Sequence, residues 1–190
     1  MDCIPDQRSF LWVIDNADKL IRVNDAWLSF ARENAAPGLT AQAVLDQPLW
    51  RFIADPETTY LYKQIFAKIR SGKSPVWIPF RCDSPECRRF MEMKLSLLAG
   101  DSIEFLSKIL KLEFRDPVAL LDQVSGRSEE FLKICSWCKK VFLPQAGWVE
   151  VEEAIRVLDL FAGPQFPQLT HGICQACLAP VEKELLKFVG

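Results

Sequence analysis

Two pairs of cysteines, each pair separated by two residues, constrain this chain more than any other feature of its sequence. Cys135 and Cys138 form the first pair, and Cys174 and Cys177 form the second. Two thiolates from one tight turn bind one side of a tetrahedral metal ion, and a second such turn completes the four ligands. The pattern therefore predicts a structural zinc site built from these four cysteines.

The gap between the two pairs is longer than in most four-cysteine sites. It comprises 35 residues, 139–173, whereas about 15–20 residues is usual. Within it, Val151, Ile155 and Leu158 recur at the spacing of one helix face, which predicts a helix over 148–161. A structured insertion of this kind is compatible with a single metal site.

The only histidine of the chain, His171, stands three residues before Cys174. It is a candidate for supporting a cysteine ligand through a hydrogen bond, as residues behind the ligands of a metal often do. Two other hypotheses stay open: His171 replaces one cysteine as a ligand, or it packs beside the turn without any role at the metal.

Two further interpretations of the cysteines compete with the metal site. A C-x-x-C motif at a helix N-terminus lowers the pKa of a thiol and supports disulfide exchange, so the chain could be a thiol-based redox sensor. No βαβ pattern precedes Cys135, however, and the second pair would then lack an explanation. Inert free thiols are the third interpretation.

The composition and the net charge limit the classes of function that this chain is expected to have. Apolar residues make up 49% of the chain and charged residues 25%, enough for a sizeable core. The net charge of −2 predicts no nucleic-acid partner, because such proteins carry strongly basic faces. Neither a secretory leader nor a stretch of roughly 18 apolar residues is visible. We therefore expect a cytoplasmic protein with reduced thiols and no membrane partner.

The order of predicted elements indicates an α+β fold with one antiparallel sheet. Apolar alternation and turn signals predict strands over 9–16, 19–23, 76–82, 89–98 and 103–114, and helices over 26–34 and 57–70. After residue 114 the pattern changes. We expect three parts: a domain over 1–114, a helical linker over 115–134, and a small, mainly helical zinc module over 135–190.

Residues 9–114 resemble a PAS domain, a small sensory fold. The resemblance rests on Trp12–Asp15 (WVID) and on Leu20–Leu28 (LIRVNDAWL), which match the opening hairpin of the family and the asparagine before its next helix. Asp46–Ile53 (DQPLWRFI) resembles the next motif but lacks its glycine. The resemblance implies a five-stranded antiparallel sheet in the order 2-1-5-4-3, and a role in sensing a ligand or in dimerisation.

The cysteine region carries a second resemblance. Ile134–Lys140 (ICSWCKK), Gly147 with Trp148, and Thr170–Leu178 (THGICQACL) resemble a segment found behind PAS and receiver domains of bacterial signalling proteins. It implies a bacterial signal-transduction protein with a protein partner.

The predicted PAS-like domain is rich in aromatic residues, which either line a pocket for a small organic ligand or fill the core. The candidates for such a pocket are Trp12, Trp27, Phe30, Trp50, Phe52, Trp77 and Phe80. The sequence does not identify the ligand. No catalytic triad and no phosphate-binding loop is visible, so we expect a homodimeric sensor that is not an enzyme.

Overall fold

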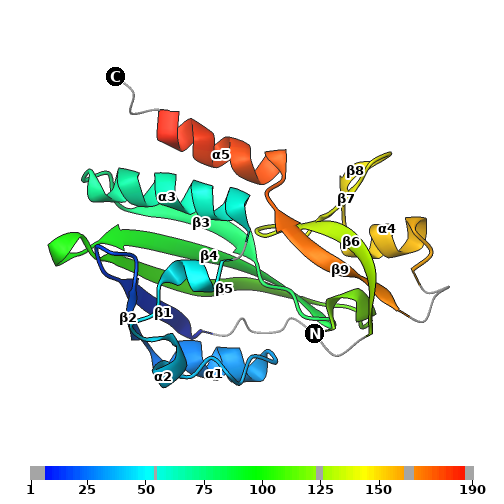
Figure 1. Ribbon diagram of the computed structural model, residues 1–190, viewed down its shortest axis with the longest axis horizontal. Coiled ribbons are helices and arrows are strands. Elements are labelled where there is room, and N and C mark those ends of the chain that lie inside the picture. The colour runs from blue at the N-terminus through cyan, green and yellow to red at the C-terminus, as the bar shows by residue number, and fades with distance from the viewer. Residues whose placement is uncertain (1–6, 54, 123–125, 161–164, 187–190) are drawn as a thin grey trace. The chain divides into compact units, whose positions relative to one another are not determined.

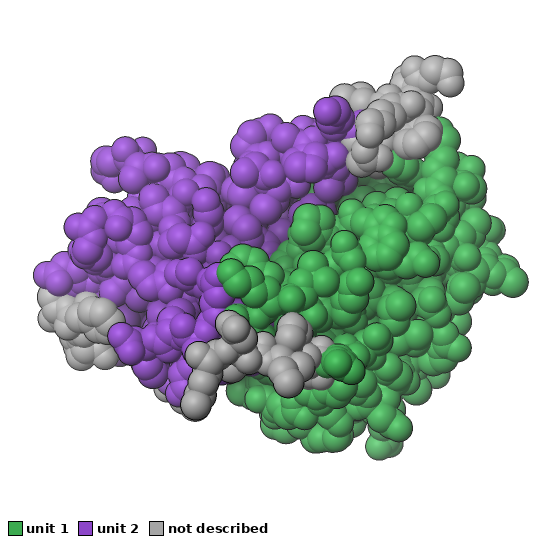
Figure 2. All heavy atoms as spheres, turned by 180° about the vertical axis from the view of Figure 1, so that it is seen from behind, with its two compact units in different colours: residues 1–80, 90–112 green, residues 81–89, 113–190 purple. Residues whose placement is uncertain are grey.

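A computed structural model describes residues 7–53, 55–122, 126–160 and 165–186 of the chain. The chain divides into two compact units, shown in two colours in Figure 2. The first unit contains Met1–Phe80 and Phe90–Leu112, and the second contains Arg81–Arg89 and Glu113–Gly190. Residues 81–89 thus belong to the second unit, although we expected one continuous domain over 1–114.

The described part of the first unit is built on a five-stranded sheet in the order β2-β1-β5-β4-β3 (Figure 1). Strand β1 pairs antiparallel with both β2 and β5. The strands are β1 (Ser9–Ile14), β2 (Leu20–Val23), β3 (Val76–Arg81), β4 (Cys87–Leu97) and β5 (Ile103–Phe114). The predicted α+β class and the predicted strand order are both confirmed.

Helices of the first unit begin where the sequence offers capping side chains. The Asn24 side chain accepts a hydrogen bond from the backbone N–H of Trp27, and that of Asp55 accepts one from Thr58, each closing the first turn of a helix. The helical segments are α1 (Asp25–Glu33), α2 (Ala41–Val44), η1 (Leu49–Arg51), α3 (Pro56–Arg70) and η2 (Ala99–Asp101). Both predicted helices are confirmed, α1 and α3 each starting one residue earlier than expected.

Aromatic rings join the helices to one face of this sheet. Phe10 and Trp12 of β1 lie two residues apart, and Trp12 pairs with Phe105 of β5, so all three side chains share that face. The Phe30 ring of α1 lies 4.6 Å from that of Phe10, and the Phe66 ring of α3 lies 5.6 Å from that of Phe105, edge to face. Helices α1 and α3 therefore pack on the same side of the sheet.

The second unit has a sheet of its own, in the order β8-β7-β6-β9 over the described residues. Strands β6 and β9 are parallel, whereas β7 is antiparallel to both β6 and β8. The elements are η3 (Ala119–Leu121), β6 (Arg127–Cys135), β7 (Val141–Leu143), β8 (Gly147–Val149), α4 (Val151–Val157), β9 (Phe166–Gly172) and α5 (Gln175–Leu186).

Two predictions about this half of the chain are wrong. The predicted helical linker over 115–134 contains most of strand β6, and the module over 135–190, expected to be mainly helical, contains the other three strands of the same four-stranded sheet. Along β6, Leu132 and Ile134 are buried while Phe131 is 65% exposed, a two-residue period. Glu and Lys favour a helix in isolation, but pairing with β7 and β9 and burial of one face outweigh that weak preference.

Helix α4 packs its apolar face against this sheet. Val151, Ala154 and Ile155 are buried in one cluster with Ile134 and Val141. The helix is shorter than the one predicted over 148–161, because Trp148 belongs to β8 and the helix ends at Val157. Residue 161, the end of the predicted helix, lies outside the described part of the chain.

Candidate metal centre

The parallel pairing of β6 and β9 brings the two cysteine pairs together. Cys135 is the last residue of β6, and it lies opposite Gly172, the last residue of β9. Because parallel strands end at the same edge of a sheet, the turn after β6 and the turn after β9 start side by side. The backbone N–H of Ser136 donates to the carbonyl of Gly172 at 2.8 Å and holds the two turns together.

The first pair lies in the tight turn between β6 and β7. The N–H of Cys135 donates to the carbonyl of Lys140 at 2.7 Å, and the N–H of Lys139 donates to the carbonyl of Cys135 at 3.0 Å. Lys139 closes the turn with a φ of +61°, a left-handed conformation that usually selects glycine. This turn points the side chains of Cys135 and Cys138 to the same side.

The second pair lies at the start of α5. Cys174 directly precedes the helix and Cys177 lies in its first turn, where the N–H groups of Cys177 and Leu178 both bond to the carbonyl of Cys174. The positive end of a helix dipole stabilises thiolates. In addition, the N–H of Cys174 donates to the sulfur of Cys135 at 3.4 Å, so the two turns share a hydrogen bond to one ligand.

The four sulfur atoms fit a tetrahedral metal ion. All four lie within 4.8 Å of one another, and those of Cys138 and Cys174 are 3.6 Å apart. A Zn–S bond of 2.3 Å in a tetrahedron places its sulfurs about 3.8 Å apart. A disulfide would need about 2.05 Å, and all the described cysteines are free. The cluster is therefore suited to hold a metal ion, and the structure brings together all four predicted ligands.

The electrostatics of the cluster favour a cation at its centre. Hydrogen bonds from Cys138 and Cys177 lower the pKa of the Cys135 thiol. The same hydrogen bond to Cys135 raises the pKa of Cys138 to about 12, and hydrogen bonds to Cys135 and Cys138 raise the pKa of Cys177. The Cys135 thiol thus loses its proton readily, whereas a second thiolate beside it is unfavourable. A bound divalent cation removes that opposition.

His171 lies on β9, paired in register with Ile134, and its side chain is exposed. The metal-capable cluster found among the described residues consists of the four cysteines. A supporting role for His171 stays a prediction.

The candidate pocket aromatics lie in different environments. Trp12 stacks on Phe105 at 5.0 Å and Trp50 lies 5.6 Å from Phe66. Phe30 contacts Phe10, as described above, and Trp27 and Phe80 are half-buried. Phe52 is 39% exposed, and Trp77 is 51% exposed on the side of β3 opposite buried Val76 and Ile78. Their predicted role in binding a ligand remains a prediction.

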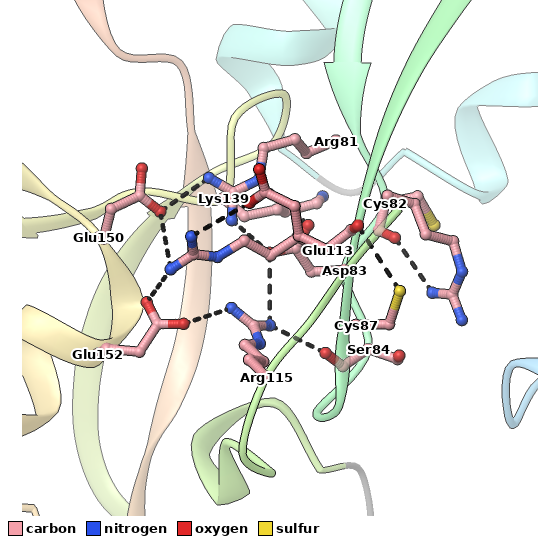
Figure 3. Close-up of polar contacts among 12 residues, drawn as sticks. Arg81, Cys82, Asp83, Ser84, Cys87, Glu113, Arg115, Lys139, Glu150 and Glu152 are labelled. Atoms are coloured by element: carbon pink, nitrogen blue, oxygen red, sulfur yellow. Dashed lines mark hydrogen bonds and ion pairs between the residues drawn. The ribbon is translucent and has the colours of Figure 1, made fainter. Parts of the chain in front are cut away.

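Sequence reasoning missed a group of charged residues in the second unit, drawn in Figure 3. Asp83 is almost fully buried between Arg81 and Arg115, and the group also includes Arg88, Glu150 and Glu152. These residues are spread over 72 positions of sequence, from 81 to 152, so no local pattern joins them. One sequence signal for an ion pair was available, because the opposite charges of Arg81 and Asp83 stand two residues apart beside a predicted turn.

The strand order 2-1-5-4-3 with helices on one face defines a PAS-like fold for the first unit, and the second unit adds a four-cysteine cluster. Solved structures similar to this chain include PAS domains and a photoactive yellow protein domain. One is the photoactive yellow protein domain of the sensor histidine kinase Ppr from Rhodospirillum centenum, at 13% identity and a TM-score of 0.41, covering 56% of this chain and 88% of that one.

Two other similar structures carry the same TM-score of 0.41. The PAS domain of the quorum-sensing receptor RpfR from Cronobacter turicensis, solved with C12:0, is 14% identical and covers 57% of this chain and all of that one. The PAS domain of BvgS from Bordetella pertussis is 16% identical, and the match covers 56% of this chain and 79% of that one. No protein-family model and no curated protein sequence matches the chain.

None of the helices in the described ranges is both long enough and apolar enough to cross a membrane.

Proposed function

We propose that this chain is a bacterial signal-transduction protein in which a PAS-like sensory unit is joined to a unit organised by a structural zinc ion. The observation that carries the proposal is the convergence of Cys135, Cys138, Cys174 and Cys177 at the shared end of two parallel strands. Residues that bind no common partner have no reason to meet in this way from positions up to 42 apart.

Zinc is the metal that this donor set favours. Four thiolates in a tetrahedral arrangement select zinc or iron over the hard cations that prefer oxygen. A zinc ion with four protein ligands has no open position for water, so it stabilises the fold and does not catalyse a reaction. We therefore propose a binding protein without an enzymatic activity of its own, active in the cytoplasm.

The proposed role of the PAS-like unit is to bind a small organic molecule or to form a homodimer, and the role of the zinc unit is to contact a protein partner. The environment of the Ser107 side chain is an observation in favour of a ligand in this unit. It is 1% exposed on the central strand β5, and its hydroxyl has no hydrogen-bond partner among the described residues. A buried hydroxyl without a partner is costly, and a polar group of a ligand would satisfy it.

Metal analysis of the protein purified without added metal tests the zinc site. We expect about one zinc per chain, the stoichiometry of a closed four-cysteine site. Cys177→Ser should lose most of the zinc, and Cys3→Ser, which changes a cysteine outside both C-x-x-C pairs, should keep it. Folded wild-type protein without metal would refute the proposal. Native mass spectrometry of the same sample then shows whether a small molecule is bound and whether the chain dimerises.

The redox hypothesis has one observation in its favour. The sulfurs of Cys138 and Cys174 lie 3.6 Å apart, and Cys138 is half-exposed, so a peroxide could oxidise these two thiolates to a disulfide and expel the metal. Release of zinc by low peroxide, reversed by a thiol reductant, would favour this second function over a purely structural site.

A further inference from the structure

The tip of the β3–β4 hairpin is part of the second unit. Residues 81–89 belong to it, while β3 and β4 continue into the sheet of the first unit. The tip is defined here as Arg81–Arg89. A short β-turn at the end of a hairpin normally extends into solvent, so the contacts of the tip within the second unit call for an explanation.

The backbone of the tip bonds to the turn that carries the first cysteine pair. The N–H of Arg81 donates to the carbonyl of Trp137 at 2.6 Å. Trp137 stands between the ligands Cys135 and Cys138 and is buried, with 4% of its surface exposed. Neither of the turn's own hydrogen bonds described above uses this carbonyl. The tip therefore holds the peptide that links two of the four predicted ligands.

Arg81 is held by its side chain as well as by its backbone. Its guanidinium donates to Asp83 within the tip at 2.5 Å and to Glu150, at the start of α4, at 2.8 Å (Figure 3). The side chain of Arg81 is 8% exposed and that of Asp83 1%. Ion pairs removed from water in this way hold their geometry, because a charge separated from its partner there is costly.

A second arginine ties the tip to α4. Arg115 donates to the carbonyl of Ser84 at 2.9 Å and to Glu152 at 2.7 Å. The N–H groups of Arg115 and Val118 also bond to the carbonyls of Glu86 and Pro85 in the tip, at 3.0 and 3.1 Å. The tip thus has contacts with the cysteine turn, with α4 and with the segment after β5.

We propose that the tip is a positioning element of the metal centre, and that its placement within the second unit is coupled to the geometry of the Cys135–Cys138 turn. Because Arg81 bonds the turn through its backbone and α4 through its side chain, any shift of the tip along the strands moves the Trp137 peptide or breaks its hydrogen bond. The coupling is reciprocal: loss of the ordered turn also releases the tip. The contacts of the tip do not depend on a metal, whereas the functional meaning of the coupling rests on the proposed metal site.

Hydrogen exchange of the full chain, read by mass spectrometry, tests the coupling with two matched variants. Glu150→Gln weakens the bond of Arg81 to α4. Glu153→Gln removes a carboxylate of the same helix whose ion-pair partner, Arg156, is 71% exposed. We expect the amides of residues 135–140 to exchange about fivefold faster in Glu150→Gln, the effect of weakening a hydrogen bond to a charged group, and to be unchanged in Glu153→Gln. Unchanged exchange in Glu150→Gln overturns the proposal.

Competition with a zinc chelator provides the second measurement. The same variant should bind zinc more weakly than Glu153→Gln and the wild type, by at most the fivefold change in opening of the turn, since the apparent affinity of a site falls with its competent fraction. Equal affinity in all three proteins overturns the coupling. Its failure is distinct from failure of the proposed function: a chain that binds no zinc but shows the exchange effect keeps the coupling and loses the metal site.

Discussion

Asp83 offers a sharp test of what the buried charges contribute to stability. Its carboxylate lies 2.5 Å from one guanidinium nitrogen of Arg81 and 3.4 Å from one of Arg115, with side chains that are 8% and 10% exposed. Asp83→Asn keeps the size and the hydrogen-bonding oxygen of the side chain but removes the charge. Two largely buried cations then lose the anion between them.

The expected cost follows from this geometry. Removing one partner of a buried ion pair destabilises a protein by about 3–5 kcal/mol. Glu150 and Glu152 remain beside the two arginines, and both are more than a third exposed, so they compensate in part. We therefore expect a loss of about 2–4 kcal/mol for Asp83→Asn, which is a large share of the 5–15 kcal/mol typical of a domain.

Urea unfolding followed by circular dichroism measures this change, with Glu104→Gln as the control. Glu104 pairs with Arg22, which is 57% exposed, so its loss should alter stability by less than about 1 kcal/mol. Thermal unfolding should show a fall in Tm on the order of 10–20 °C for Asp83→Asn. A loss below about 1 kcal/mol would show that the buried charges do not stabilise the second unit as argued.

Three further predictions concern local structure. Ala35 follows the C-terminus of α1 with a φ of +59°, where glycine is favoured, so Ala35→Gly should raise the free energy of unfolding by about 0.5–1 kcal/mol in urea denaturation. On β6, Leu132→Ala should cost about 2–4 kcal/mol and Phe131→Ser less than about 1 kcal/mol, and equal costs would contradict the strand assignment. Burial acts to raise the pKa of Glu152, but hydrogen bonds from its backbone and two arginines outweigh it and lower that pKa below 4.5. Its contribution to stability is therefore complete above pH 4.5 and is lost as the pH falls through the lower folded pKa, so Glu152→Gln should flatten the acid limb of a stability–pH curve.

Much of the first unit follows from local signals. Asn24 and Asp55 cap helices where they stand in the sequence, and apolar alternation marks the strands that form the sheet. These features depend on residues within a few positions of one another. Only the strand order required more, and the resemblance to a PAS domain supplied it.

The second unit shows where local signals fail. Arg127–Cys135 contains helix-favouring residues, yet it forms a central strand because it pairs with β9, whose residues lie 37–39 positions further along the chain. The hairpin tip Arg81–Arg89 looked like an ordinary turn between two strands. Its place in the second unit depends on bonds to residues around 115, 137 and 150, which no window of sequence contains.

The cysteines show both sides of this division. Their chemistry and their two-residue spacing are local, so the sequence alone was enough to name all four members of the cluster. Which sulfurs meet is decided by the parallel pairing of β6 and β9, whose ends carry the two pairs to one edge of a sheet. The physical reason is that the spacing within a turn fixes the direction of the two thiols of one pair. Burial and strand pairing over long separations decide which other residues lie beside those thiols.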